Sequence, residues 1–403
     1  MPSPPLHKDE EEQQEDSLAA SNMSAAKKAK GMKARRPELG VVMPKMEEAA
    51  PPPAPPVNLD DHCQMHLAGK DYEVHAKNLL RIEELGRGAY GVVETMRHQE
   101  SGQIMAVKRI HVSLNSEEQK RMLIELQTSM KSGCCPYMVR FYGAMFRDGD
   151  VWICMEVMDS SLDKFYRMCV DLKRPIPENI LAKIALAVIQ ALNYMHKELQ
   201  LMHRDVKPSN ILINQQGDIK MCDFGISGHL TDSVAKTVNA GCKPYMAPER
   251  INPDDPRQAA YDVRSDVWSV GITIIEISTG THPYAKWKTP FEQLKQVVYE
   301  PPPRLLSSTE VQSFSEEFQD FIAQCMTKSF KSRPKYQQLL EHAWLVAAEA
   351  DTQTDVGQFV SEILSAQKKK KDEILQQLRE IRVAEPQQDV LMADPANTPP
   401  SSR

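Results

Sequence analysis

A short run in the middle of the chain places a carboxylate, an ammonium group and an amide close together: His203-Arg204-Asp205-Val206-Lys207-Pro208-Ser209-Asn210. An Asp-Phe-Gly triplet begins at Asp223, thirteen residues after Asn210. Asp205 can accept a hydroxyl proton, and Lys207 can neutralise the charge of a phosphate in transfer. The hard oxygens of Asn210 and Asp223 suit Mg²⁺. A buried histidine, a proline turn and a capping aspartate could explain single residues, but hardly all of them in this order. The run therefore predicts a phosphoryl-transfer site.

A glycine-rich segment lies upstream: Gly86-Arg87-Gly88-Ala89-Tyr90-Gly91-Val92-Val93. Glycines lack a Cβ atom, so such a backbone can close over phosphates. The spacing alone is weak evidence, because dinucleotide-binding folds share it. Here a strand-like pattern follows the glycines instead of a helix, which favours a lid over ATP. The predicted nucleotide contacts in this segment are Gly86, Arg87, Gly88, Ala89, Tyr90, Gly91 and Val93.

A lysine follows in the next predicted strand, where Lys108 ends Ala106-Val107-Lys108. A buried lysine can neutralise the α- and β-phosphates of ATP if a carboxylate holds it in place. Glu125, on a helix predicted over residues 115–130, is the preferred partner, since a core-facing stripe lies beside it. Glu117 and Glu118 compete for this role, and a solvated helix position is the plain alternative. Ala106 is predicted to line the same nucleotide site.

Two further features are predicted to support the site. Glu249, in Ala247-Pro248-Glu249, is expected to form a buried ion pair with Arg333. Asp266, at the start of the most apolar predicted helix, is expected to anchor the backbone around Asp205. Breaking a buried ion pair by removing one partner is costly, so these residues read as structural supports.

Composition and charge exclude several classes. The 403 residues carry a net charge of −6, with 49 basic and 55 acidic side chains, which gives no case for nucleic-acid binding or membrane insertion. The eight cysteines have no metal-like spacing. Reduced thiols and a cytoplasmic location are therefore expected, with the nucleus as an additional option.

Three regions follow from composition and periodicity. Residues 1–77 combine acidic, basic and proline-rich stretches, and are expected to be a disordered tail. Residues 78–347 alternate strand-like patterns and then become mainly helical, which predicts an α+β domain with a small lobe (78–158) and a larger lobe (159–347). In the tail 348–403, two helices are expected, over 351–365 and 368–381, with disorder from Ala384.

Residues from about 79 to 347 resemble the eukaryotic protein kinase domain, with every signature in order. Within that domain, some segments resemble the MAP kinase kinases of the stress-activated branch. These are Trp152-Ile153-Cys154-Met155-Glu156, Met221-Cys222-Asp223-Phe224-Gly225-Ile226-Ser227-Gly228, Asp232-Ser233-Val234-Ala235-Lys236-Thr237 and Ala240-Gly241-Cys242-Lys243-Pro244-Tyr245-Met246-Ala247-Pro248-Glu249-Arg250-Ile251.

This resemblance implies a bilobal fold, ATP and Mg²⁺ as cofactors, and a MAP kinase phosphorylated on Thr and Tyr in its activation lip. It implies that Met155 is the gatekeeper and that Glu156 and Met158 offer backbone groups to adenine. It also implies that an upstream kinase phosphorylates Ser233 and Thr237. A phosphate there would bring negative charge that could order the segment.

The tail before the domain carries a basic cluster and a spaced apolar pair, within residues 27–44. This pattern resembles the arm by which the family docks to its MAP kinase, and the predicted docking residues are Lys33, Arg35, Arg36, Leu39 and Val41. A nuclear-localisation-like run or a solvated tail is the alternative. Apolar pairs near 354–366 are interpreted either as an upstream-kinase docking helix or as a helix packed on the large lobe.

Three other functions compete with this interpretation. A pseudokinase scaffold would require damage to Lys108, Asp205, Asn210 or Asp223, and all four are intact. A non-catalytic interaction module would leave the complete site unexplained. A kinase for the Jun-kinase class is the closer competitor, since residues 258–269 favour it. Residues 151–155 and 232–237 favour a MAP kinase with a Thr-Gly-Tyr lip.

Overall fold

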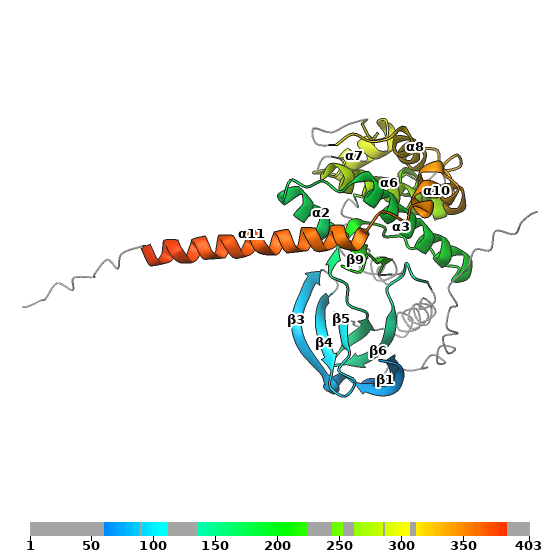
Figure 1. Cartoon of the computed structure of the whole chain (residues 1–403). Helices are drawn as coiled ribbons and strands as arrows, with labels where there is room; N and C mark the ends of the chain where they lie inside the picture. The colour runs from blue at the N-terminus through cyan, green and yellow to red at the C-terminus, as the bar shows by residue number, and fades with distance from the viewer. Residues whose placement is uncertain are drawn as a thin grey trace, which may run out of the picture. The chain divides into compact units, whose positions relative to one another are not determined.

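The computed structural model describes residues 60–88, 91–111, 135–223, 244–252, 262–284, 287–306 and 312–384. All of them belong to one compact unit within Ala50–Arg403. A β-rich small lobe and a helical large lobe make up this unit (Figure 1), so the predicted α+β class is confirmed. No helix among the described residues is both long and apolar enough to cross a membrane.

The small lobe is built on a five-stranded antiparallel sheet in the order β3-β4-β5-β7-β6. Its strands are β3 (Leu79–Gly88), β4 (Gly91–His98), β5 (Ile104–His111), β6 (Phe141–Arg147) and β7 (Asp150–Met155). The strand expected directly after the glycines and the next one, which carries Lys108, are both present as β4 and β5. Before β6, Met138 forms an isolated bridge with Met221.

The predicted disorder of residues 1–77 is wrong for the last part of that range. β1 (His62–Leu67) and β2 (Lys70–His75) form an antiparallel hairpin, and the short 3₁₀ helix η1 (Ala76–Asn78) follows it. Met65, Leu67 and Val74 are fully buried in one cluster with residues of the main sheet. The segment carries few apolar residues, but they recur with the period of two that buries one face of a strand.

The large lobe is formed mainly by helices around a single apolar core. These are α2 (Leu162–Asp171), α3 (Glu178–Glu198), α5 (Pro248–Ile251), α6 (Val263–Thr279), α7 (Pro290–Gln293), α8 (Glu316–Cys325), α9 (Tyr336–Leu340) and α10 (Ala343–Ala350), with a π-helical turn, η4 (Leu294–Tyr299). α3 begins directly after Pro177, whose fixed φ suits a helix start. α6 is almost wholly buried, as its apolar composition predicts.

Residues 203–210, which carry the predicted base Asp205, lie beside a small three-stranded sheet with the strand order β10-β9-β8. The sheet consists of β8 (Ser160–Ser161), β9 (Ile211–Ile213) and β10 (Ile219–Met221), and the 3₁₀ turn η3 (Pro208–Asn210) leads into it. The β9–β10 hairpin sets the end of β10 next to η3, because the Cys222 N–H donates to the Asn210 carbonyl over 3.0 Å. This contact brings the two predicted metal-binding residues, Asn210 and Asp223, into one place.

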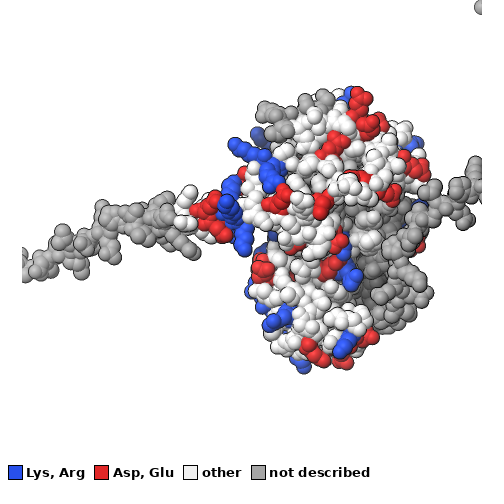
Figure 2. All heavy atoms as spheres, viewed as in Figure 1, with Lys and Arg blue, Asp and Glu red and all other residues white. Residues whose placement is uncertain are grey.

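One continuous helix, α11 (Val356–Ala384), replaces the two helices predicted in the C-terminal tail. Between residues 358 and 384 there is no glycine or proline, so nothing local ends the helix. The sequence pattern predicts that the lysine run 368–371 starts a new helix. Instead, it continues the same one, and Lys370 pairs with Asp171 of α2 over 2.7 Å. Figure 2 shows basic and then acidic side chains along this exposed stretch.

The first turns of α11 pack on the large lobe. Val360 and Ile363 are fully buried, and the Phe359 ring meets the Phe165 ring of α2 at 5.9 Å. Gly357 makes the approach possible, because a Cβ there would lie 2.6 Å from the Gln215 carbonyl oxygen. The structure therefore shows a packed helix at residues 356–366, and docking of an upstream kinase to this segment stays a prediction.

Candidate active site

The loop between α3 and β9 holds the predicted base in a polar cradle. The Lys207 ammonium group donates to Asp205 Oδ2 over 2.6 Å. The Asn210 amide nitrogen donates to the Asp205 carbonyl at 2.8 Å and to Asp205 Oδ2 at 3.1 Å. One carboxylate oxygen thus receives two donors, which hold the carboxyl group in one orientation. Asn210 Nδ2 is committed to Asp205, so Asn210 Oδ1 is the atom placed to bind a cation.

Buried groups fasten this loop to the rest of the large lobe. Asp266, fully buried in α6, accepts the backbone N–H of His203 at 3.1 Å and of Arg204 at 3.0 Å. The predicted anchoring by Asp266 is confirmed. Tyr336 also donates to Asp266 over 3.0 Å. His203 Nε2 lies 3.0 Å from the Cys222 carbonyl, which ties the loop to the end of β10.

Two residues of the site have left-handed backbone conformations, Arg204 with φ 67° and Asp223 with φ 63°. The other described non-glycine residues with positive φ lie outside the site, several of them at turns between elements. Such conformations cost about 1–3 kcal/mol each and persist only where the surroundings impose them. Here the Asp266 carboxylate holds the Arg204 N–H, so the strained backbone is fixed by a buried group.

Lys108 and Asp223 form the ion pair at the centre of the site. Lys108 Nζ lies 2.7 Å from Asp223 Oδ1, and their side chains are 14% and 26% exposed. Burial alone would lower the pKa of Lys108, but the charge of Asp223 outweighs it, so the pKa is raised above 10.5. Burial would raise the pKa of Asp223, but Lys108 outweighs it and the pKa falls below 3.8. Both groups are therefore ionised across the physiological range.

Register on the sheet explains the surroundings of Lys108. It lies opposite Val93 of β4 and Ile153 of β7, while Ala106 lies opposite Met155. Residues i and i+2 of a strand share a face, so Ala106 and Lys108 present their side chains on the same side of the sheet. The predicted gatekeeper, Met155, is thus the cross-strand neighbour of the predicted nucleotide-lining Ala106.

The segment after β7 reaches the large lobe through Glu156. Its N–H donates to the Arg140 carbonyl over 3.0 Å, and its carboxylate accepts Lys220 at 2.8 and 2.9 Å. Since its N–H is engaged, the Glu156 carbonyl is the backbone group suited to adenine. Met158 is buried, and its sulfur lies 3.7 Å from Asn214 Nδ2.

The glycine-rich strand pair has one position that admits only glycine. Gly91 has φ +145°, and a Cβ there would lie 1.9 Å from the Arg109 carbonyl oxygen. β3 and β4 meet at Gly88 and Gly91, beside Arg87, which pairs with Glu84 over 3.0 Å. The close approach of Gly91 to β5 therefore fixes the start of β4, where the glycine-rich segment predicted to cover ATP joins the sheet.

We expect Gly91→Ala to lower the thermal midpoint and to weaken ATP binding at least tenfold, because the backbone must shift away from β5. Gly102→Ala is the matched control, since Gly102 also has positive φ (+70°) but nothing lies within 4 Å of its would-be Cβ. It should cost only about 1–2 kcal/mol of stability. Titration calorimetry with ATP and thermal denaturation measure both effects. Equal losses in the two variants would contradict the steric argument.

Lys164 of α2 contacts the glycine-rich strand β3, and the sequence pattern does not predict this contact. Its ammonium group donates to the Leu85 carbonyl over 2.7 Å, and Lys164 Nζ is the atom nearest a would-be Cβ of Gly86. A residue of the large lobe thus touches the strand that leads into the glycine-rich turn. No local motif marks Lys164, because the contact spans 79 residues of sequence.

Several predicted residues lie outside the described part of the chain. These are Ala89, Tyr90, Glu125, Phe224, Gly225, Ser233, Thr237, Lys33, Arg35, Arg36, Leu39 and Val41. The Lys108–Glu125 pair consequently stays a prediction. Cys222, by contrast, is described: burial raises the pKa of its thiol well above 9.0, which agrees with an inert buried thiol.

The described residues fit a nucleotide and a divalent cation. Asn210 Oδ1 and the Asp223 carboxylate are hard oxygen donors of the type that Mg²⁺ prefers. Lys108 supplies a buried positive charge next to them. A small sheet-rich lobe, a helical lobe and this constellation between β5, η3 and β10 define a protein kinase.

The comparisons with known proteins agree with that class. The protein kinase domain matches residues 79–345. Dual specificity mitogen-activated protein kinase kinase sek-1 of Caenorhabditis elegans is 55% identical over 337 residues, which cover 83% of this chain and 97% of that protein. Dual specificity mitogen-activated protein kinase kinase 7 is 43% identical in Homo sapiens and 44% in Rattus norvegicus, over 74% of this chain and 70% of each relative.

The chain belongs to the family of dual specificity mitogen-activated protein kinase kinases. It is therefore an ATP-dependent protein kinase, and the family implies ATP and a divalent metal as cofactors. The predicted family and the predicted enzyme class are both confirmed.

Proposed function

We propose that this protein transfers the γ-phosphoryl group of ATP to a threonine and a tyrosine in the activation lip of a stress-activated MAP kinase with a Thr-Gly-Tyr lip. The observation that carries the chemistry is the Asp205 carboxylate, held by Lys207 and Asn210 next to Asp223. The names of the relatives support a MAP kinase as the substrate, because each is called a mitogen-activated protein kinase kinase.

Each charged group of the site has one role in this proposal. Asp205 accepts the proton of the substrate hydroxyl, and Lys207, 2.6 Å away, neutralises charge on the transferring group. Asn210 and Asp223 would hold Mg²⁺, which would supply charge neutralisation at the phosphates when bound. Lys108 contacts the α- and β-phosphates, which requires it to exchange its Asp223 partner for phosphate oxygens.

The proposal includes activation by an upstream kinase that phosphorylates Ser233 and Thr237. Both hydroxyls lie in sequence between Asp223 and Glu249. A phosphate brings up to two negative charges, and Arg204 beside Asp205 is a suitable partner in charge. The basic and apolar residues within 27–44 are proposed to dock the MAP kinase, and the protein is proposed to act in the cytoplasm.

The decisive experiment uses a Ser233→Glu/Thr237→Glu variant and a panel of inactive MAP kinases, with the phosphosites mapped by mass spectrometry. We expect Thr and Tyr of a Thr-Gly-Tyr lip to be modified, with turnover of roughly 1–100 per second. Preference for the Jun-kinase class would overturn the substrate assignment. Phosphorylation outside the lip would overturn the dual-specificity reaction.

Two further arms of this experiment separate activation from docking. The Ser233→Ala/Thr237→Ala variant should not respond to an upstream kinase, and normal activation would contradict the phosphosites. Deletion of residues 27–44 should raise the KM for the intact MAP kinase and leave a short lip peptide unaffected. An equal loss on both substrates would count against docking.

A further inference from the structure

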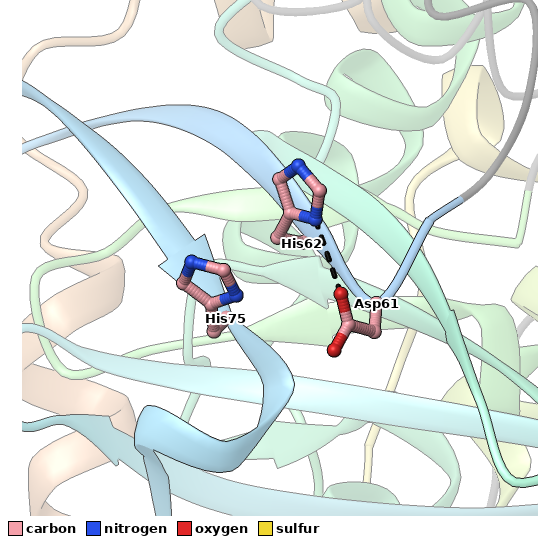
Figure 3. Close-up of side chains that lie close together, drawn as sticks. All are labelled: Asp61, His62 and His75. Carbon is pink, nitrogen blue, oxygen red and sulfur yellow. Dashed lines mark hydrogen bonds and ion pairs between the residues drawn. The ribbon is translucent and has the colours of Figure 1, made fainter.

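The β1–β2 hairpin carries a group of histidines and carboxylates that phosphoryl transfer does not use. His62 and His75 are direct partners across the two strands, and their rings stack with centroids 5.0 Å apart. Asp61 directly precedes β1 and lies 3.1 Å from His62 Nδ1 (Figure 3). One ligand atom from each of Asp61, His62 and His75 lies within 4.8 Å of the other two.

We propose that Asp61, His62 and His75 form a binding site for Zn²⁺ or a chemically similar divalent transition-metal ion. Two imidazole nitrogens and a carboxylate oxygen are the donor types that Zn²⁺ takes, with water completing the coordination. Mg²⁺ prefers oxygen donors alone, so this site is distinct in chemistry from the one at Asn210 and Asp223.

A fourth residue orients the rings. Glu73 Oε1 lies 3.2 Å from His75 Nε2 and 3.9 Å from His62 Nε2. Histidines that bind metals commonly donate their other ring N–H to a carboxylate, which selects the tautomer and raises the basicity of the ligand nitrogen. Glu73 is thus close enough to accept Nε2–H from His75, and it faces Nε2 of His62 at ion-pair distance. The other edge of each ring is then left for the ion, and Figure 3 shows a ring nitrogen of His62 and of His75 on the side of Asp61.

The backbone that carries these ligands is already fixed. The Asp61 carbonyl accepts the Ala76 N–H at 2.9 Å, which closes the open end of the hairpin. The neighbouring Asp60 carbonyl accepts the Phe146 N–H at 2.8 Å, which fastens the same end to β6. The side chains themselves remain accessible, with His62 39% and His75 29% exposed.

The ligand atoms need only a modest side-chain movement to close on an ion. With Zn–N bonds of about 2.0–2.1 Å, tetrahedral ligand atoms lie roughly 3.3 Å apart. Partly exposed side chains can supply that movement by small rotations about χ1 and χ2 while the strands stay in register. Because His62 and His75 lie on different strands, a bound ion cross-links β1 to β2 and stabilises the hairpin.

The test is titration of the full chain with Zn²⁺ at neutral pH in excess Mg²⁺, followed by calorimetry and by the thermal midpoint. We expect one saturable site whose affinity falls at least tenfold in His62→Gln and in His75→Gln. Glu73→Gln, which keeps all three ligands, should weaken binding less than either histidine variant. The rise of the thermal midpoint with Zn²⁺ should disappear in the His62→Gln/His75→Gln double variant.

His66→Gln is the matched control. His66 lies on the same hairpin and pairs across the strands with Asp71 over 2.7 Å, but no second histidine adjoins this pair in the described hairpin. Zn²⁺ affinity should be unchanged in His66→Gln. Paramagnetic Co²⁺ gives a second readout, since it should broaden the imidazole resonances of His62 and His75 before that of His66. Wild-type affinity in the double variant, or an equal loss in His66→Gln, would overturn the site.

Discussion

Asp205→Ala should reduce the phosphoryl-transfer rate of the activated kinase by roughly 10²–10⁴-fold, the usual contribution of a general base. That loss corresponds to about 3–5 kcal/mol of transition-state stabilisation. The physical reason is the position of one carboxylate oxygen. Asp205 Oδ2 accepts hydrogen bonds from Lys207 Nζ and Asn210 Nδ2, which hold it in place as a proton acceptor. Single-turnover phosphate incorporation into an inactive MAP kinase measures the effect.

The same variant should bind ATP almost as tightly as the native chain, because Lys108 and Asp223 do not depend on Asp205 for their pairing. Asp205→Asn keeps the shape of the side chain and should be nearly as inactive. Asp320→Asn is the control, an exposed carboxylate on α8 that pairs with His342. Near-native transfer by Asp205→Ala would refute the base assignment. A parallel loss of ATP affinity would indicate that the whole site had collapsed.

Arg333→Met should produce the largest loss of stability, about 3–5 kcal/mol. The Arg333 side chain is fully buried and forms a two-point pair with Glu249, at 2.8 and 3.1 Å. It also donates to the Arg264 carbonyl over 2.7 Å and lies 5.2 Å from the Trp268 ring centroid. Its removal leaves the mostly buried Glu249 carboxylate without its counter-charge. Equilibrium denaturation with urea measures the difference.

Arg174→Met is the matched comparison for this buried pair. Arg174 pairs with Glu362 over 2.7 Å, but both side chains are more than 40% exposed. An exposed pair of this kind contributes about 0–1 kcal/mol, because water competes for both charges. The Arg333→Met/Glu249→Gln double variant should lose less than the sum of its single variants. Similar costs for Arg333→Met and Arg174→Met would contradict the role of burial.

Much of the site could be predicted from sequence because its chemistry is carried by short segments. Asp205, Lys207 and Asn210 lie in one loop, so their proximity follows from covalent spacing. The Glu249–Arg333 pair and the anchoring by Asp266 were also predicted, since each belongs to a recognisable motif. The structure confirms these contacts with distances of 2.8–3.1 Å.

Contacts across long sequence separations could not be predicted in the same way. Lys164 reaches Leu85 over 79 residues, and no local pattern marks either residue for the other. Lys108 pairs with Asp223 across 115 residues of sequence, a contact that the spacing of the motifs does not predict. Glu125 lies outside the described residues, so the predicted Lys108–Glu125 pair stays a prediction. Which carboxylate meets a buried lysine depends on how the lobes close around it.

The sequence by itself determined the family, the order of the chemical groups and the fold class, because each is encoded in local motifs and their spacing. Only the tertiary structure decided that residues 62–75 form a hairpin, since burial of Met65 and Val74 depends on a sheet formed by later residues. It also decided that α11 is one helix, fastened to α2 by Phe359 and Lys370. The tertiary structure likewise decided that His62 and His75 lie side by side. The register of β1 with β2 pairs them, although they are far apart in the sequence.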